Sequence, residues 1–90
     1  MLFMVIEQFH DGKAAAVYER ARTSGRQLPD GLTYVDSWVT GDFSRCFQIM
    51  ECDDERLFEP WIAAWSDLVS FEIVPIMGSA TAAAHFSSGN

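Results

Sequence analysis

The first segment of the chain places the tightest limit on its fold. Residues 2–9, LFMVIEQF, are apolar at both alternating positions until Glu7 and Gln8, a pattern typical of a β-strand covered on both faces. Helices of the same chain can cover one face. A domain this small buries only about 60 to 65% of its unfolded surface, so we expect a partner molecule to cover the other.

The remaining sequence predicts two helices and three further strands. These elements are a helix over residues 13–24, strands over 32–40 and 44–51, a helix that begins after Asp53 or Asp54, and a last strand over 70–77. Gly25 is expected to cap the first helix. The order βαββαβ is that of the ferredoxin-like fold, an α+β plan in which a four-stranded antiparallel sheet carries two helices on one face.

Two prolines and the last residues refine this plan. Pro60 lacks an amide donor inside the second helical pattern, so it predicts a kink or a fresh helix start near Glu59. Pro75 removes one ladder donor from the last strand and predicts an edge position or a bulge. Residues 78–90 are small and polar, which indicates a flexible C-terminal tail or an arm on a partner after a domain over residues 1–77.

The sheet face without helices is predicted to be apolar as well. The first strand is apolar on both sides, and the last strand carries Phe71 and Ile73 on one side and Val74 and Ile76 on the other. A large exposed apolar face marks an interface. We therefore expect a homodimer in which two open sheet faces pack together, as in a dimeric α/β barrel.

Composition argues against several classes of protein. A net charge of −7 and six scattered basic residues disfavour binding to nucleic acid or an anionic membrane, and no run approaches the roughly 20 apolar residues of a membrane span. Cys46 and Cys52 would lie about 20 Å apart on one strand, beyond disulfide reach, so two free thiols indicate the cytoplasm. No phosphate loop, dinucleotide fingerprint or metal-ligand spacing occurs, and we expect neither cofactor nor metal.

The chain contains four motifs: MLFMVIE at the start, GRxLPxGLxYVxSW at 25–38, RCFQxME at 45–51 and WxxxWxDLxxFExxPI at 61–76. Together they resemble a family of small bacterial proteins known only as a domain of unknown function. Members of that family are placed in the dimeric α/β-barrel superfamily. The resemblance therefore implies a ferredoxin-like fold and a homodimer, and it implies no catalytic residues.

The second predicted strand sorts its side chains by alternation, with Tyr34, Asp36 and Trp38 on one face. If the hairpin loop is residues 41–43, these three pair with Met50, Gln48 and Cys46, respectively. That face would point away from the helices, whereas Phe47 and Ile49 would lie beneath them. A register shift of one residue would swap the faces of the third strand, and the sequence leaves the register open.

Asp36 is the first candidate catalytic residue. With Glu7 on the neighbouring strand it could line a semi-apolar pocket, where burial would raise the pKa of a carboxyl group and make it a proton-transferring base. Alternatively, Asp36 hydrogen-bonds across the dimer to Arg26, Arg45 or a backbone amide. His10 is a further candidate.

The candidate ligand-binding residues are Tyr34, Trp38, Gln48, Arg26 and Trp65. Arg26 could grip a substrate carboxylate with its planar fork, or pair with a local acid. Trp65 could wall a ligand cavity between helix and sheet, or belong to the core.

Three functions remain open. The first is binding of a small apolar or aromatic metabolite between sheet and helices. The second is catalysis by a cofactor-independent monooxygenase or an isomerase, although Asn90 is the only asparagine and a site that relies on asparagine is poorly supported. The third is a purely structural or interaction dimer.

Overall fold

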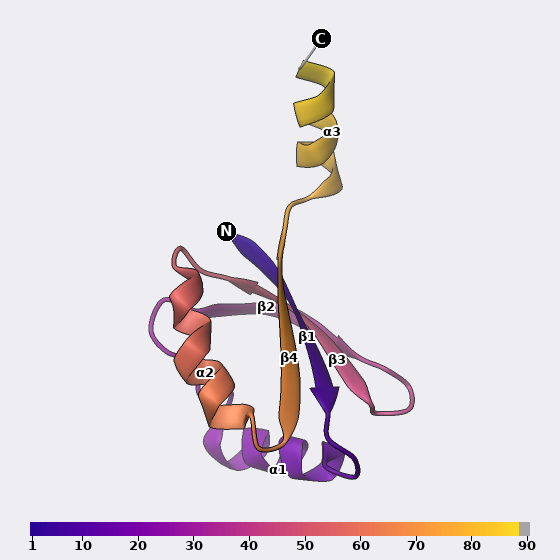
Figure 1. Ribbon diagram of the computed structural model, residues 1–90, viewed down its shortest axis with the longest axis vertical. Helices are drawn as coiled ribbons and strands as arrows, with labels where there is room; N and C mark the ends of the chain where they lie inside the picture. Colours follow the sequence, from indigo (N-terminus) through magenta and orange to yellow (C-terminus); the bar gives the residue numbers. More distant parts are fainter. Residues whose placement is uncertain (89–90) are drawn as a thin grey trace.

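The computed structural model describes residues 1–88, which form one antiparallel sheet and three α-helices. The strands are β1 (Leu2–Phe9), β2 (Thr33–Val39), β3 (Arg45–Glu51) and β4 (Val69–Ile76). The helices are α1 (Ala14–Ser24), a 3-10 turn η1 (Glu55–Leu57), α2 (Phe58–Trp65) and α3 (Ser79–Ser88). With the strand order β2-β3-β1-β4, the α+β, ferredoxin-like fold is confirmed (Figure 1).

The core lies between the sheet and helices α1 and α2. Burial alternates along β1, so that one side of this strand supplies Phe3, Val5, Glu7 and Phe9 to the core. Val17 of α1 packs on that side, together with the apolar face of α2. Each large side chain buried there stabilises the fold by about 1.5 to 3 kcal/mol, so the apolar stripe of α2 fixes this helix against the sheet.

Glycine and proline define three boundaries of these elements. Gly25 ends α1 with a φ of 67°, and its amide donates to the Ala21 carbonyl over 2.9 Å. Pro60 is the third residue of α2, where a missing amide donor leaves no intrahelical bond unmade, so the predicted fresh start near Glu59 is confirmed. Pro75 lies in β4, an edge strand, as its missing amide predicts.

The second face of the sheet, here called the open face, carries neither α1 nor α2. Its residues alternate with the buried ones along β1 and occupy the matching positions of the neighbouring strands. They include Leu2, Met4, Ile6, Phe47, Ile49, Val74 and Ile76. The prediction that the first and last strands give this face apolar side chains is therefore confirmed, although Gln8, Arg45 and Glu72 lie on the same face.

The predicted register of the β2–β3 hairpin is wrong by one residue near the turn. Four residues, 41–44, separate Thr40 and Arg45, whose backbones bond over 2.9 Å, whereas the prediction assumed a loop of three residues. Trp38 therefore pairs with Phe47, and Asp36 pairs with Ile49.

A β-bulge between Tyr34 and Asp36 corrects the register farther from the turn. Beyond it, Tyr34 pairs with Met50 as predicted. Because a bulge inserts one extra residue, it inverts the alternation of side chains along the strand. Tyr34 therefore points toward the helices, whereas Asp36 and Trp38 lie on the open face.

The two faces of β3 also differ from the prediction. Cys46, Gln48 and Met50 are buried beneath the helices, whereas Phe47 and Ile49 lie on the open face. The predicted assignment of the two faces of this strand is therefore reversed.

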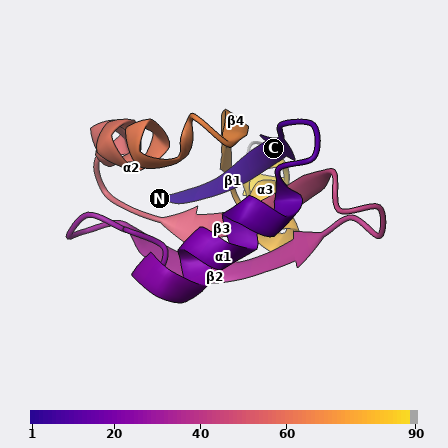
Figure 2. The same ribbon diagram turned by 90° about the horizontal axis from the view of Figure 1, so that it is seen from below.

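Residues 78–90, predicted as a flexible tail, contain helix α3. It follows β4 and projects beyond the end of the sheet in Figure 1, and it lies behind the body in Figure 2. This projection gives the molecule a longest dimension of 51 Å. Residues 89 and 90 of the predicted tail lie outside the described residues.

Candidate functional site

A cavity of about 240 Å³ lies on the helix side of the sheet. Its apolar lining comes from the core, and its polar lining comes from strands β1, β2 and β3 and from the segment after α1. The lining residues are Glu7, Phe9, Val17, Tyr18, Ala21, Gly25, Arg26, Ser37, Val39, Cys46, Gln48, Trp61 and Trp65. The cavity thus combines tryptophan and aliphatic surface with a few polar groups, as small-molecule sites commonly do.

Glu7 is the one carboxylic acid among the described residues that line the cavity. It is only 6% exposed, and its Oε2 atom has no hydrogen-bond partner within residues 1–88. Burial raises the pKa of this carboxyl group from 4.5 to about 7, against a smaller lowering by the charge of Arg26. Near neutral pH, Glu7 therefore exchanges a proton readily.

Gln48 is the second buried polar residue of the cavity. It pairs with Ser37 of β2 and Val5 of β1, and it is 7% exposed. Its Oε1 atom also lacks a partner in the described part of the chain. Glu7 pairs with Cys46, two residues from Gln48 along β3, so both unpaired oxygens belong to side chains on one face of adjacent strands.

Arg26 organises one wall of the cavity through its backbone and its side chain. The indole nitrogens of Trp61 and Trp65 both donate to the Arg26 carbonyl, each over 3.0 Å. The guanidinium lies 3.5 Å from the centre of the Tyr34 ring, a cation–π contact. The residue thus fixes the two tryptophans of α2 relative to β2.

Tyr34 reaches this wall because of the bulge in β2. Its hydroxyl group and that of Ser37 lie 2.6 Å apart, so one donates to the other. Ser37 is the next residue on the same face, since the bulge separates them by three positions instead of two. Tyr34 therefore supports the cavity from behind Arg26 and Ser37.

Cys46 is part of the cavity but is a poor nucleophile there. Burial raises the pKa of its thiol to about 12, and the charge of Glu7 acts in the same direction. Because the thiolate is the reactive form, this cysteine behaves as a small apolar lining group.

Three of the predicted site residues lie elsewhere. Asp36 and Trp38 lie on the open face, where Trp38 is 54% exposed. The Asp36 carboxylate accepts a hydrogen bond from the Ser37 amide over 2.8 Å. One predicted alternative was a hydrogen bond between Asp36 and a backbone amide across the dimer. The bond observed here joins Asp36 to a backbone amide of the same chain. The structure therefore separates Asp36 from Glu7 by the thickness of the sheet.

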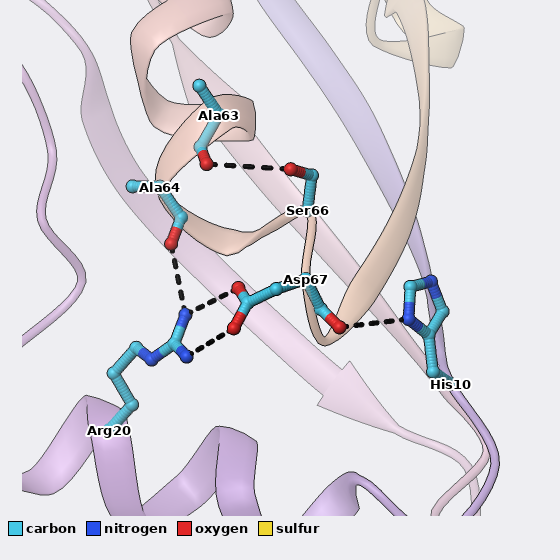
Figure 3. Close-up of polar contacts among 6 residues, drawn as sticks. All are labelled: His10, Arg20, Ala63, Ala64, Ser66 and Asp67. Carbon is cyan, nitrogen blue, oxygen red and sulfur yellow. Dashed lines mark hydrogen bonds and ion pairs between the residues drawn. The ribbon is translucent and has the colours of Figure 1, made fainter.

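His10 belongs to a polar cluster at the end of β1, outside the cavity lining (Figure 3). Its Nδ1 atom donates to the Asp67 carbonyl over 3.2 Å, and Nε2 lies 3.0 Å from the Ser70 hydroxyl. The Arg20 guanidinium bonds both carboxylate oxygens of Asp67 over 2.8 and 2.6 Å. These contacts join α1 and β1 to the turn before β4.

The structure brings together Glu7, Gln48, Arg26 and Trp65 on the helix side of the sheet, with Tyr34 behind them, whereas the predicted register put Tyr34 and Gln48 on the opposite face. It also adds lining residues from α1 that were expected on the inner face of this helix but not predicted as site residues, namely Val17, Tyr18 and Ala21. Val17 and Tyr18 lie four and three positions before Ala21, a spacing that places side chains on one helix face. This spacing is the sequence signal from which the three residues could have been found. No group of three or more His, Cys, Asp or Glu side chains within residues 1–88 is arranged to hold a metal ion.

The fold and cavity define a small α+β protein of the ferredoxin-like class. The family model described as "Domain of unknown function (DUF3303)" matches residues 1–90, and the chain belongs to this family. No curated protein matches the sequence. Within residues 1–88, no helix is long and apolar enough to cross a membrane.

Proposed function

We propose that this protein is a cytoplasmic homodimer that binds a small, mainly apolar or aromatic metabolite in the cavity between sheet and helices. One observation carries the proposal: Glu7 and Gln48 are more than nine-tenths buried, line the cavity and each leave an oxygen without a partner. Leaving a buried polar group unsatisfied costs about 1 to 3 kcal/mol. A ligand that bonds these oxygens removes this cost.

The size and walls of the cavity favour an aromatic ligand. An apolar cavity of about 150 Å³ accepts benzene, so about 240 Å³ has room for one ring with a polar substituent. Trp61 and Trp65 offer large ring surfaces against which such a ligand packs.

The open face supports the homodimer. Its half-buried apolar residues and the exposed Trp38 would be covered if two copies packed face to face about a twofold axis. Arg45 and Glu72 lie on the same face, and the ion pairs within residues 1–88 include neither of them. Two copies can therefore oppose unlike charges. Two free, buried cysteines fit the reducing cytoplasm.

Tryptophan fluorescence tests the binding proposal directly. Trp38 lies outside the cavity, so Trp38→Phe leaves Trp61 and Trp65, both cavity-lining, as the reporters. Titration of this variant with benzamide should change its emission saturably. Ala21→Leu fills part of the cavity and should weaken binding at least about tenfold, whereas Ala16→Leu, on the exposed side of α1, should leave it unchanged. Equal responses of the two leucine variants would refute binding in this cavity.

Native mass spectrometry and sedimentation test the homodimer. Ile49→Glu places a charge on the open face and should give a monomer, whereas Ala63→Glu on the exposed side of α2 should remain a dimer. A monomeric wild-type protein would refute the assembly. A dimer that binds none of the aromatic probes would favour the purely structural role.

A second candidate function is proton-transfer catalysis, in the manner of an isomerase. The observation that favours it is the pKa of about 7 that burial gives Glu7, a value suited to a general base at neutral pH. Glu7→Gln should then abolish conversion of a bound substrate while binding persists. Conversion that survives this substitution would exclude Glu7 as the base.

A further inference from the structure

Two hydrogen-bond donors at the cavity wall are already engaged. The indole N–H groups of Trp61 and Trp65 both point to the Arg26 carbonyl. An indole nitrogen has a single hydrogen to donate. Neither tryptophan can therefore donate to a ligand unless it breaks its bond to Arg26.

One hydroxyl hydrogen of this wall is engaged as well, because the Tyr34 and Ser37 hydroxyl oxygens lie 2.6 Å apart and one group donates to the other. The Arg26 guanidinium covers the Tyr34 ring at 3.5 Å, and Arg26 is an exposed residue. Within residues 1–88, the buried side-chain atoms left without a partner are two acceptors of this cavity, Glu7 Oε2 and Gln48 Oε1.

The strand pairing makes the residues that carry these two acceptors diagonal neighbours on one sheet face. Glu7 faces Cys46 across the β1–β3 pair, and Gln48 lies two residues along β3. Such diagonal neighbours stand roughly 7 to 8 Å apart on one sheet face. Because the side chains of Glu7 and Gln48 are long, their terminal oxygens can lie closer together than this, which shortens the distance that the ligand has to span.

From this inventory we propose that the ligand class is an aromatic base that presents two N–H donors on one edge, as amidines do, with Glu7 and Gln48 as its acceptors. The inference rests on the proposed function, since it names the chemistry of that ligand. An ionised carboxylate accepts hydrogen bonds and cannot donate them. A ligand carboxylate at the same place would meet two acceptors and the charge of Glu7.

Three probes of nearly one shape test this assignment: benzamidine, benzamide and benzoate. Each is titrated into Trp38→Phe at pH 8, where Glu7 is mostly ionised. A hydrogen bond to a charged group contributes about 1.5 to 3 kcal/mol, so benzamidine should bind at least about tenfold more tightly than benzoate. Glu7→Gln should remove most of this preference and leave benzamide binding within about threefold. Glu55→Gln, at an exposed position, controls for the change in net charge and should retain the preference.

A second measurement needs no substitution at Glu7. Benzamidine stays protonated between pH 6 and 8, so its affinity should rise with pH as Glu7 ionises, while that of benzamide stays level. The groups that face Glu7 keep their charge over this range: Tyr18 of α1 and Cys46 of β3 have raised pKa values, and Arg26 stays protonated. The neighbours from α2 and β4, Trp61 and Phe71, do not titrate.

The outcomes separate this inference from the binding proposal. Benzoate binding as tight as benzamidine binding would overturn the ligand class and leave the cavity a binding site. Benzamidine affinity that does not change between pH 6 and 8 would also overturn it. If none of the three probes binds and Ala21→Leu changes nothing, both the ligand class and the binding proposal fail.

Discussion

Replacing Glu7 with glutamine should change how stability depends on pH. The folded protein holds the Glu7 proton up to about pH 7, whereas an ordinary glutamate releases it near 4.5. Between these values the folded state binds more protons than the unfolded state, so the stability of the wild-type protein falls as pH rises through this window. Glutamine has the same shape as glutamate and no charge to bury. The stability of Glu7→Gln should therefore not fall as pH rises through this window.

The expected size follows from the two pKa values. A rise from 4.5 to about 7 corresponds to about 3 kcal/mol of free energy of unfolding, lost between pH 4.5 and 8. Relative to its value at pH 4.5, the stability of Glu7→Gln should therefore exceed that of wild type by about 3 kcal/mol at pH 8. For a domain of this size, that difference raises the melting temperature by more than about 10 °C.

Urea denaturation followed by tryptophan fluorescence measures the difference at several pH values and one protein concentration. Subtracting the value at pH 4.5 removes any pH-independent cost of burying the amide. Glu59→Gln, at an exposed position of α2, is the matched control and should run parallel to wild type. If the Glu7→Gln curve also runs parallel to wild type from pH 4.5 to 8, Glu7 is not buried in the way described here.

Three further predictions concern Asp42, Arg20 and Cys46. Asp42→Ala should lower the melting temperature at neutral pH, and the difference should vanish as pH falls toward 2, because hydrogen bonds from Ser44 and Thr40 lower the pKa of this carboxyl group to about 2. Arg20→Ala should lower the melting temperature more than Arg20→Lys, since lysine keeps the charge but not both bonds to Asp67; equal losses would contradict this. Cys46 should react with a thiol reagent at pH 8 only after unfolding, because burial raises its pKa to about 12. Fast labelling of the native protein would disprove it.

Much of the fold could be predicted because the signals are local and agree with one another. The two-sided apolar pattern of residues 2–9 places β1 in the centre of the sheet. Gly25 and Pro60 mark element boundaries through their own backbone chemistry. Each of these signals acts within a few residues, so one sequence is enough to read it.

The faces of β3 could not be predicted in the same way. Both alternating sets of that strand contain apolar residues, Cys46 and Met50 on one side and Phe47 and Ile49 on the other. A register shift of one residue exchanges them with little difference in pattern. The loop length that decides between them depends on how residues 40–44 fold, and there Phe43 adopts a φ of 59°, a conformation that non-glycine residues rarely take.

The bulge in β2 links this irregularity of the sheet to the candidate site. In a regular strand with the observed hairpin loop, Tyr34, Asp36 and Trp38 would all lie on the open face. The bulge moves Tyr34 to the helix side, whereas the register set by the loop keeps Asp36 and Trp38 on the open face. Asp36 therefore stays away from Glu7, whose like charge would oppose it. The loop thus leaves Glu7 as the buried acid of the cavity, and the bulge adds the Tyr34 ring behind it.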